Sequence, residues 1–103
     1  DRSRGERLPL EWVVHKQTAE PASLFGFADR GCIAPGFKAD INLIDYDRLH
    51  IHAPEMAYDL PAGGRRLLQR ATGYVATLVS GAPIIEDGVA TGERPGRLIR
   101  GGR

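Results

Sequence analysis

Hydrophobic positions near the start of the chain recur at helical spacing. Pro9 stands where the first turn of a helix tolerates proline, and apolar residues follow it at intervals of three and four. Thr18 is a candidate cap for a second helix, which Gly26 would end. The pattern predicts one or two short helices within residues 8–30, after a flexible lead-in at residues 1–7.

Beyond Gly31 the pattern changes to short β-type runs between glycines and prolines. The runs that favour strands are residues 40–46, 74–79, 83–85 and 97–100. The first of them has apolar residues on both faces, which predicts burial between two layers. The pairs Ser80-Gly81 and Asp87-Gly88 predict turns, whereas residues 47–66 predict a long irregular stretch. The order of elements indicates a mixed α+β fold, with a helical segment followed by a small β-rich sheet.

Composition narrows the class of protein. Apolar residues make up 42% and charged residues 26% of the 103 residues, which fits one compact domain, or a domain with a piece of its neighbour. The formal net charge of +1 favours neither nucleic acid nor an anionic membrane, and no apolar run reaches the ~20 residues of a membrane span. A single cysteine, Cys32, excludes an internal disulfide and favours a cytoplasmic setting.

Two neighbouring segments form a recognisable series. Residues 18–26 read TAEPASLFG, and residues 30–45 read RGCIAPGFKADINLID. This series resembles the closing signature of the amidohydrolase superfamily, in which a last barrel helix leads through a turn into a strand. Gly36 permits the tight turn, Pro35 fixes its backbone, and Asp40 is a candidate acceptor for backbone N–H groups within that turn.

Later segments narrow the resemblance to one branch of the superfamily. They are DLPAGG at residues 59–64 with Arg66, ATGY at 71–74, VSG at 79–81, Thr91-Gly92, and Pro95-Gly96-Arg97. Together they are similar to the tail of the N-acyl-D-amino-acid deacylases, also called D-aminoacylases. The likeness runs from about Leu8 to Gly101.

The resemblance implies a C-terminal, non-catalytic portion of a zinc-dependent amidohydrolase that hydrolyses the N-acyl amide bond of D-amino acids. It implies that residues 8–30 come from the end of a TIM-like barrel and residues 31–103 from the C-terminal part of a small β-sandwich domain. A complete barrel needs roughly 250 residues, so the catalytic barrel is the expected partner. The family's metal ligands and catalytic aspartate lie on the barrel, so no catalytic, cofactor-binding or metal-binding residue is assigned here.

His50-Ile51-His52 has the His-x-His pattern of a metal-binding pair, and two histidines two apart on a strand point to one side. Glu55 and Asp59 are the nearby residues that could add a ligand. Because these histidines fall in the expected irregular stretch, we interpret them as surface-loop residues in preference to ligands. His15 is interpreted as a partly exposed helix residue.

Three other groups of residues carry side chains that could act in catalysis or anion binding. Cys32 could be a nucleophile beside a base, but no histidine pattern supports a dyad, so a small buried thiol is expected. Glu86-Asp87 is interpreted as part of a turn rather than an acid/base pair. Residues 63–66 (GGRR), with Arg70, could cradle an anion, although we expect these arginines to face the barrel or solvent.

Two hypotheses follow from the sequence. The first is the non-catalytic tail of an amidohydrolase, inactive by itself, with zinc held elsewhere in the parent enzyme. The alternative is a free-standing, β-rich binding or interaction module without catalysis. Under the first hypothesis the isolated chain is expected to self-associate, because its apolar residues would lack the surfaces that cover them.

Overall fold

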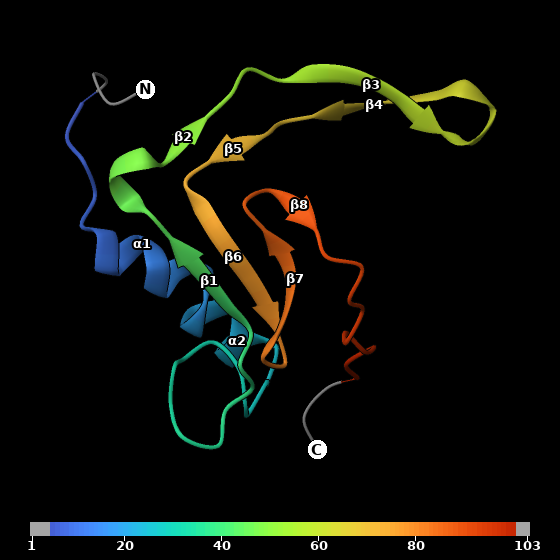
Figure 1. The fold of residues 1–103 in the computed structure, drawn as a ribbon. Helices are drawn as coiled ribbons and strands as arrows, with labels where there is room; N and C mark the ends of the chain where they lie inside the picture. The colour runs from blue at the N-terminus through green and yellow to red at the C-terminus, as the bar shows by residue number, and fades with distance from the viewer. Residues whose placement is uncertain (1–4, 101–103) are drawn as a thin grey trace. The chain divides into compact units, whose positions relative to one another are not determined.

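The computed structural model describes residues 5–100, which fall into two compact units (Figure 1). The first unit runs up to Ala39 and takes in the chain again from Gly96, and the second is Asp40–Pro95. Residues 1–4 of the expected lead-in lie outside the described residues, as do residues 101–103 of the expected β domain.

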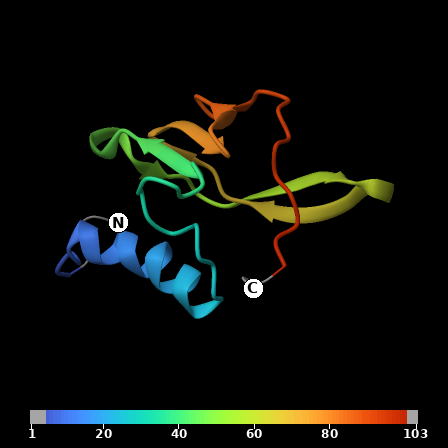
Figure 2. The same cartoon turned by 90° about the horizontal axis from the view of Figure 1, so that it is seen from below.

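Two short helices open the first unit, as predicted (Figure 2). α1 spans Leu10–Gln17 and α2 spans Ala19–Leu24, and Thr18 alone separates them. The predicted side-chain cap is wrong, because the Thr18 hydroxyl donates to the Val14 carbonyl oxygen of α1 at 2.6 Å. A hydroxyl bonded back to the preceding turn is not available to the N–H groups of α2. Lys16 bridges the junction by binding Glu20 at 2.8 Å.

The segment after α2 is a folded loop without regular structure. The predicted turn at residues 34–36 is present, and the Phe37 N–H closes it on the Ala34 carbonyl oxygen at 3.1 Å. Gly36 has a φ of +85°, which favours glycine over residues with a side chain. The Lys38 N–H then donates to the Asp29 carbonyl oxygen at 2.9 Å, so the loop returns on itself before the second unit begins.

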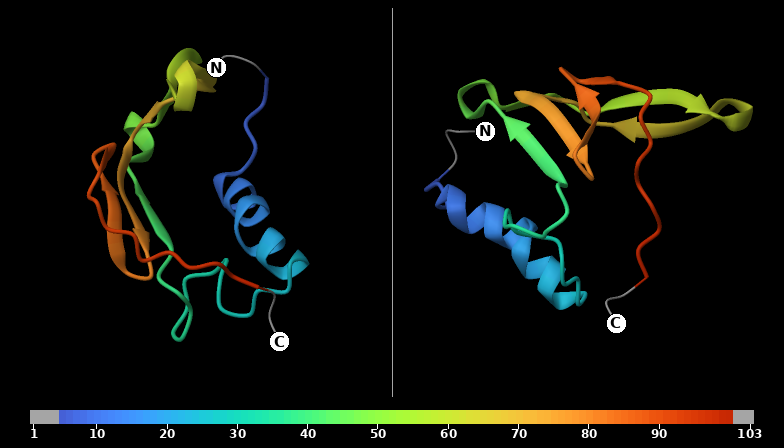
Figure 3. Two further views of the ribbon diagram at one scale, coloured as in Figure 1. Left: turned by 90° about the vertical axis from the view of Figure 1, so that its right-hand side faces the viewer. Right: turned by 60° about the horizontal axis from the view of Figure 1, so that its bottom comes forward.

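The second unit is built on one long, interrupted hairpin (Figures 1 and 3). Its outgoing strands are β1 (Ile41–Ile44), β2 (His50–Ile51) and β3 (Glu55–Leu60), and its returning strands are β4 (Gly64–Leu68), β5 (Ala71–Thr72) and β6 (Tyr74–Val79). The antiparallel pairs are nested, β1 with β6, β2 with β5, and β3 with β4. The tip is the short 3₁₀ segment η2 (Pro61–Gly63). We call β3, η2 and β4 the arm.

The prediction of an irregular stretch at residues 47–66 is therefore wrong. That range contains the 3₁₀ segment η1 (Tyr46–Arg48) in part, then β2, β3, η2 and the start of β4. Strands of two residues are too short to show alternation of apolar and polar positions. Their backbone groups are satisfied by a strand that returns many residues later, and such pairing leaves little trace in local sequence.

A four-stranded antiparallel sheet completes the second unit, in the order β1-β6-β7-β8. β7 (Ala82–Glu86) and β8 (Val89–Ala90) follow β6 through the two predicted turns. Ser80 and Gly81 both have positive φ, as do Asp87 and Gly88, and this pairing is typical of type I′ hairpin turns. The predicted closing strand at residues 97–100 is wrong, since the described chain leaves the sheet after β8 and gains no strand partner there.

Burial is slight in both units. Among the described residues, Ala22 of α2, at 7% exposure, is the one hydrophobic residue classed as buried. The prediction that the first strand is buried on both faces is wrong, because β1 is an edge strand and Leu43 is 56% exposed. The chain is a mixed α+β protein whose apolar faces remain largely uncovered.

Candidate functional site

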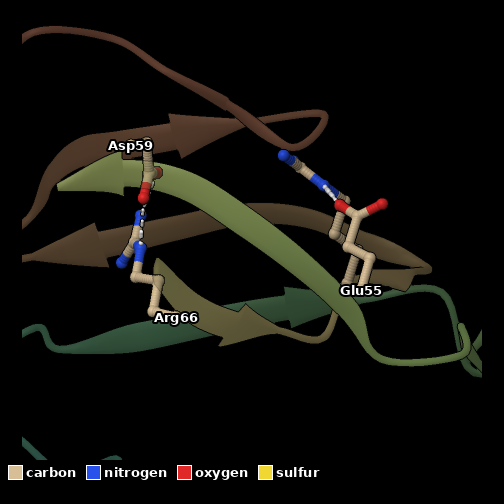
Figure 4. A network of polar contacts seen from close by, with 4 residues as sticks. Glu55, Asp59 and Arg66 are labelled. Carbon is tan, nitrogen blue, oxygen red and sulfur yellow. Dashed lines mark hydrogen bonds and ion pairs between the residues drawn. The ribbon is translucent and has the colours of Figure 1, made fainter. Parts of the chain in front are cut away.

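The densest group of charged contacts lies on the arm (Figure 4). Arg66 of β4 donates two hydrogen bonds to Asp59 of β3, from Nε to Oδ1 at 2.8 Å and from Nη2 to Oδ2 at 2.6 Å. A second pair follows toward the base of the arm, where Arg70 Nε lies 3.1 Å from Glu55 Oε1. Two-point contact between a guanidinium and a carboxylate fixes the orientation of both groups.

An irregularity in the strand pairing brings the first pair together. Ala57 lies opposite Arg66 and Leu60 lies opposite Gly64, so two residues of β3 stand against one residue of β4 between these points. A bulge of this kind redirects side chains on the longer strand. Asp59 is one of the two bulged residues, and its carboxylate lies against the Arg66 guanidinium (Figure 4).

The pairing shifts the titration of both partners. The hydrogen bond from Arg66 is the main reason why the pKa of Asp59 lies below its ordinary value of 3.8. The same bond raises the pKa of Arg66. Both side chains are about half exposed, so water and salt screen their attraction. The contact therefore contributes little to the stability of the fold.

The structure does not support the anion-binding site considered for residues 63–66 and Arg70, because two of its arginines are already paired with carboxylates. Arg66 is bound by Asp59 and Arg70 by Glu55, so carboxylates of the same arm already neutralise two guanidinium groups. Both arginine side chains are exposed in this chain, which fits the expectation that they face the barrel or solvent. The spacing of Asp59 and Arg66 around a Pro-Ala-Gly-Gly turn is the sequence signal that could have revealed their pairing.

The histidine pair lies at the base of the arm. His50 is in β2, opposite Thr72 of β5, so its assignment to a loop is wrong, while His52 follows the strand. Their ring centroids are 5.1 Å apart. Glu55 and Asp59, the ligands considered beside them, instead contact arginines. No group of three or more metal-ligating side chains occurs among the residues that the structure describes.

The remaining candidates are separate from the arm. Cys32 is exposed in the irregular loop after α2, so the expected buried thiol is wrong. Asp87 lies in the turn between β7 and β8, as predicted. His15 is exposed on α1, with Nδ1 3.9 Å from Glu20 Oε2. Neither helix of the described chain has the length and hydrophobicity of a membrane span.

The fold and the site define a mixed α+β segment in which Asp59 and Glu55 of the arm bind Arg66 and Arg70. The chain belongs to the amidohydrolase family, whose family model matches residues 1–85.

Similar proteins of known activity match different shares of the chain. N-acyl-D-glutamate deacylase of Alcaligenes xylosoxydans xylosoxydans is 36% identical over 95 residues, which are 92% of this chain and 17% of that protein. D-aminoacylase of the same organism is 32% identical over 92 residues, 89% of this chain and 17% of its own length. Dihydroorotase of Desulforapulum autotrophicum is 42% identical over 50 residues, 48% of this chain and 11% of its own. No solved structure matches.

The chain therefore spans 17% of the length of the deacylases that it resembles.

Proposed function

We propose that this chain is the non-catalytic C-terminal portion of a metal-dependent amidohydrolase that hydrolyses the N-acyl amide bond of D-amino acids. The observation that carries the proposal is the unequal coverage of the deacylases. About nine-tenths of this chain is matched, but 17% of each relative. A segment of that kind contributes to the fold of an enzyme whose reacting groups lie elsewhere.

The length of each match also supports a deacylase over an enzyme that hydrolyses cyclic amides. The dihydroorotase match ends after 50 residues, whereas the two deacylase matches extend over 92 and 95 residues. The longer matches necessarily include parts of the chain that the dihydroorotase match leaves out. A match over most of the chain supports membership of the deacylase group better than a match over half of it does.

Within this proposal the two helices end the catalytic barrel and the sheet belongs to the small β domain. The boundaries are those expected from the sequence, residues 8–30 and 31–103. The apolar side chains Leu24 and Phe25 of the helical segment are 81% and 68% exposed, which leaves a surface for a neighbouring element to cover. The barrel of the same protein is the proposed cover, and the cytoplasm is the proposed setting.

Zinc is the metal that the proposal assigns to the parent enzyme. The side chains of this chain do not fit such a centre, since a catalytic zinc site takes three protein ligands and the described residues bring no three together. The role of this chain in the reaction is then indirect, through the stability and placement of the barrel.

A substrate panel with the full-length protein tests the proposal. N-acetyl-D-glutamate, its L enantiomer and dihydroorotate are supplied before and after chelation of metal. We expect turnover of the D substrate, little turnover of the L form, loss of activity on chelation and recovery with zinc. Turnover of dihydroorotate in place of the acylated D-amino acid would move the protein to the cyclic amidases.

The fragment itself provides the second half of the test. The 103-residue chain alone is expected to turn over none of these substrates. A stable, monomeric chain with its own binding activity would favour the alternative, a free-standing interaction module.

A further inference from the structure

The two histidines of the arm base are paired in space as well as in sequence. His50 and His52 are separated by one residue along an extended segment, so their side chains project to the same side. Their ring centroids lie 5.1 Å apart, with the ring planes at 88°. Both residues are exposed.

The backbone beneath this pair is fixed by the returning half of the hairpin. His50 is in register with Thr72, and the His52 N–H donates to the Arg70 carbonyl oxygen at 2.9 Å. Gln69 Nε2 donates to the His52 carbonyl oxygen at 3.1 Å. These bonds hold both Cα positions, so the imidazoles need only rotate about their side-chain bonds.

The ring separation matches the demand of one metal ion. Metal–nitrogen bonds of about 2 Å place the centroids of two ligating imidazoles about 4.5 Å apart at a square-planar angle and about 5 Å apart at a tetrahedral angle, so the observed separation is close to both. The χ2 torsion of histidine is broad, so turning one ring brings a nitrogen of each toward a shared point at little cost. We propose that His50 and His52 form a two-imidazole site for a divalent transition metal.

The identity of the metal follows from the number of ligands. Zinc sites in proteins use three or four side chains, whereas here Glu55 is engaged by Arg70 and no group of three ligating side chains occurs within residues 5–100. Two imidazoles with water in the remaining positions suit the ions at the top of the affinity order, Cu²⁺ first and Ni²⁺ next. The site is independent of the zinc proposed for the barrel and of the reaction that the barrel catalyses.

Titration of the full-length protein with Cu²⁺ and, separately, with Ni²⁺ tests the site. The probes are the metal ions alone, followed by calorimetry, with electron paramagnetic resonance of the copper form. We expect that the double variant His50→Ala/His52→Ala loses one bound equivalent. Either single variant is expected to weaken that equivalent roughly 100-fold, because the second imidazole no longer binds as part of a chelate.

His15→Ala is the matched control, because it removes the third histidine of the chain from an exposed helix. It is expected to leave both the stoichiometry and the affinity unchanged. Equal binding by the wild type and the double variant would overturn the site. Loss with one single variant but not the other would overturn the chelate, because it would leave one histidine acting alone. Circular dichroism of the variants confirms that each is folded as the wild type.

Discussion

On the exposed arm, one carboxylate holds one guanidinium through two hydrogen bonds. The side chains of Asp59 and Arg66 are about half exposed, which limits the contribution of their contact to stability. The contact nevertheless lowers the pKa of Asp59. Because the folded pKa is depressed, the pair contributes fully above the unfolded value of 3.8 and its contribution is lost as pH falls through the lowered pKa.

The first prediction concerns that titration. In Arg66→Gln, the Asp59 pKa is expected to rise toward 3.8, because the hydrogen bond that lowers it is gone. Carboxyl chemical shifts followed through an acid titration measure it. Arg70→Gln is the control, since the charge of Arg70 has the smallest influence on the Asp59 pKa and its loss should move that pKa little. An Asp59 pKa that stays low in Arg66→Gln would show that Arg66 is not the group that lowers it.

A glycine at the base of the arm gives the second prediction at this scale. Gly73 has a φ of +98°, and an added Cβ would lie 2.7 Å from Leu49 Cα. Gly73→Ala is expected to destabilise the chain by about 2–4 kcal/mol, through backbone strain together with the clash. Unfolding in urea, followed by circular dichroism, measures the loss.

Gly88→Ala separates the two causes. Gly88 has a φ of +80° and open space where a Cβ would stand. The variant therefore introduces backbone strain without a clash, and we expect it to lower the free energy of unfolding by about 1 kcal/mol. Equal losses in the two variants would mean that Leu49 can move away from Gly73.

At the scale of elements, an aspartate links the start of β1 to the turn between β6 and β7. Asp40 Oδ1 accepts the Ser80 N–H at 2.9 Å. The sequence makes Asp40 a candidate acceptor for N–H groups of the turn that precedes its own strand. Its bond to Ser80 reaches a residue forty positions away, because β1 pairs antiparallel with β6 and its start lies beside that strand's end.

The third prediction tests this link. Asp40→Ala is expected to cost about 1 kcal/mol, the usual net value of such a bond. Faster amide hydrogen exchange at Ser80 would report the loss directly. Asp40→Asn retains the acceptor oxygen and should lie close to the wild type, and Asp47→Ala serves as an exposed acidic control in η1. Unchanged exchange at Ser80 in Asp40→Ala would contradict the assigned bond.

At the scale of the whole molecule, exposed apolar surface is the main feature. The exposed apolar residues of the helices include Leu10, Val14, Leu24 and Phe25, and those of the sheet include Leu43, Ile44 and Val75. β1 and β8 are the edges of the four-stranded sheet, and each leaves backbone groups open to further pairing. Surfaces of this kind associate unless another part of the protein covers them.

The fourth prediction is that the isolated 103-residue chain forms dimers or larger assemblies over about 1–100 μM. Burial of the helical stripe and extension of the sheet across chains are the expected modes. Sedimentation measures the association. The double variant Leu24→Ser/Phe25→Ser should weaken it, while Ile33→Ser, which changes an exposed loop residue, is the control. A monomer that binds no hydrophobic dye would contradict the prediction and favour a free-standing module.

Local patterns predicted the elements that depend on near neighbours. Both helices, β6 at residues 74–79 and the turns at Ser80-Gly81 and Asp87-Gly88 stand where the sequence placed them. Helical hydrogen bonds join residues four apart, and type I′ turns need two consecutive residues that tolerate positive φ. Such requirements are visible in a short window of sequence. The series of motifs across the chain was enough to indicate the amidohydrolase family.

The sequence by itself thus determined the helices, the tight turns and the family. Only the tertiary structure decided that residues 47–66 contain β2 and most of the arm, that Arg66 and Arg70 are held by Asp59 and Glu55, and that β1 is an exposed edge. The charged pairs join residues 7 and 15 apart, and the bond from Ser80 to Asp40 spans 40. Contacts over such separations depend on the register of two strands, and register is set by the folded hairpin as a whole.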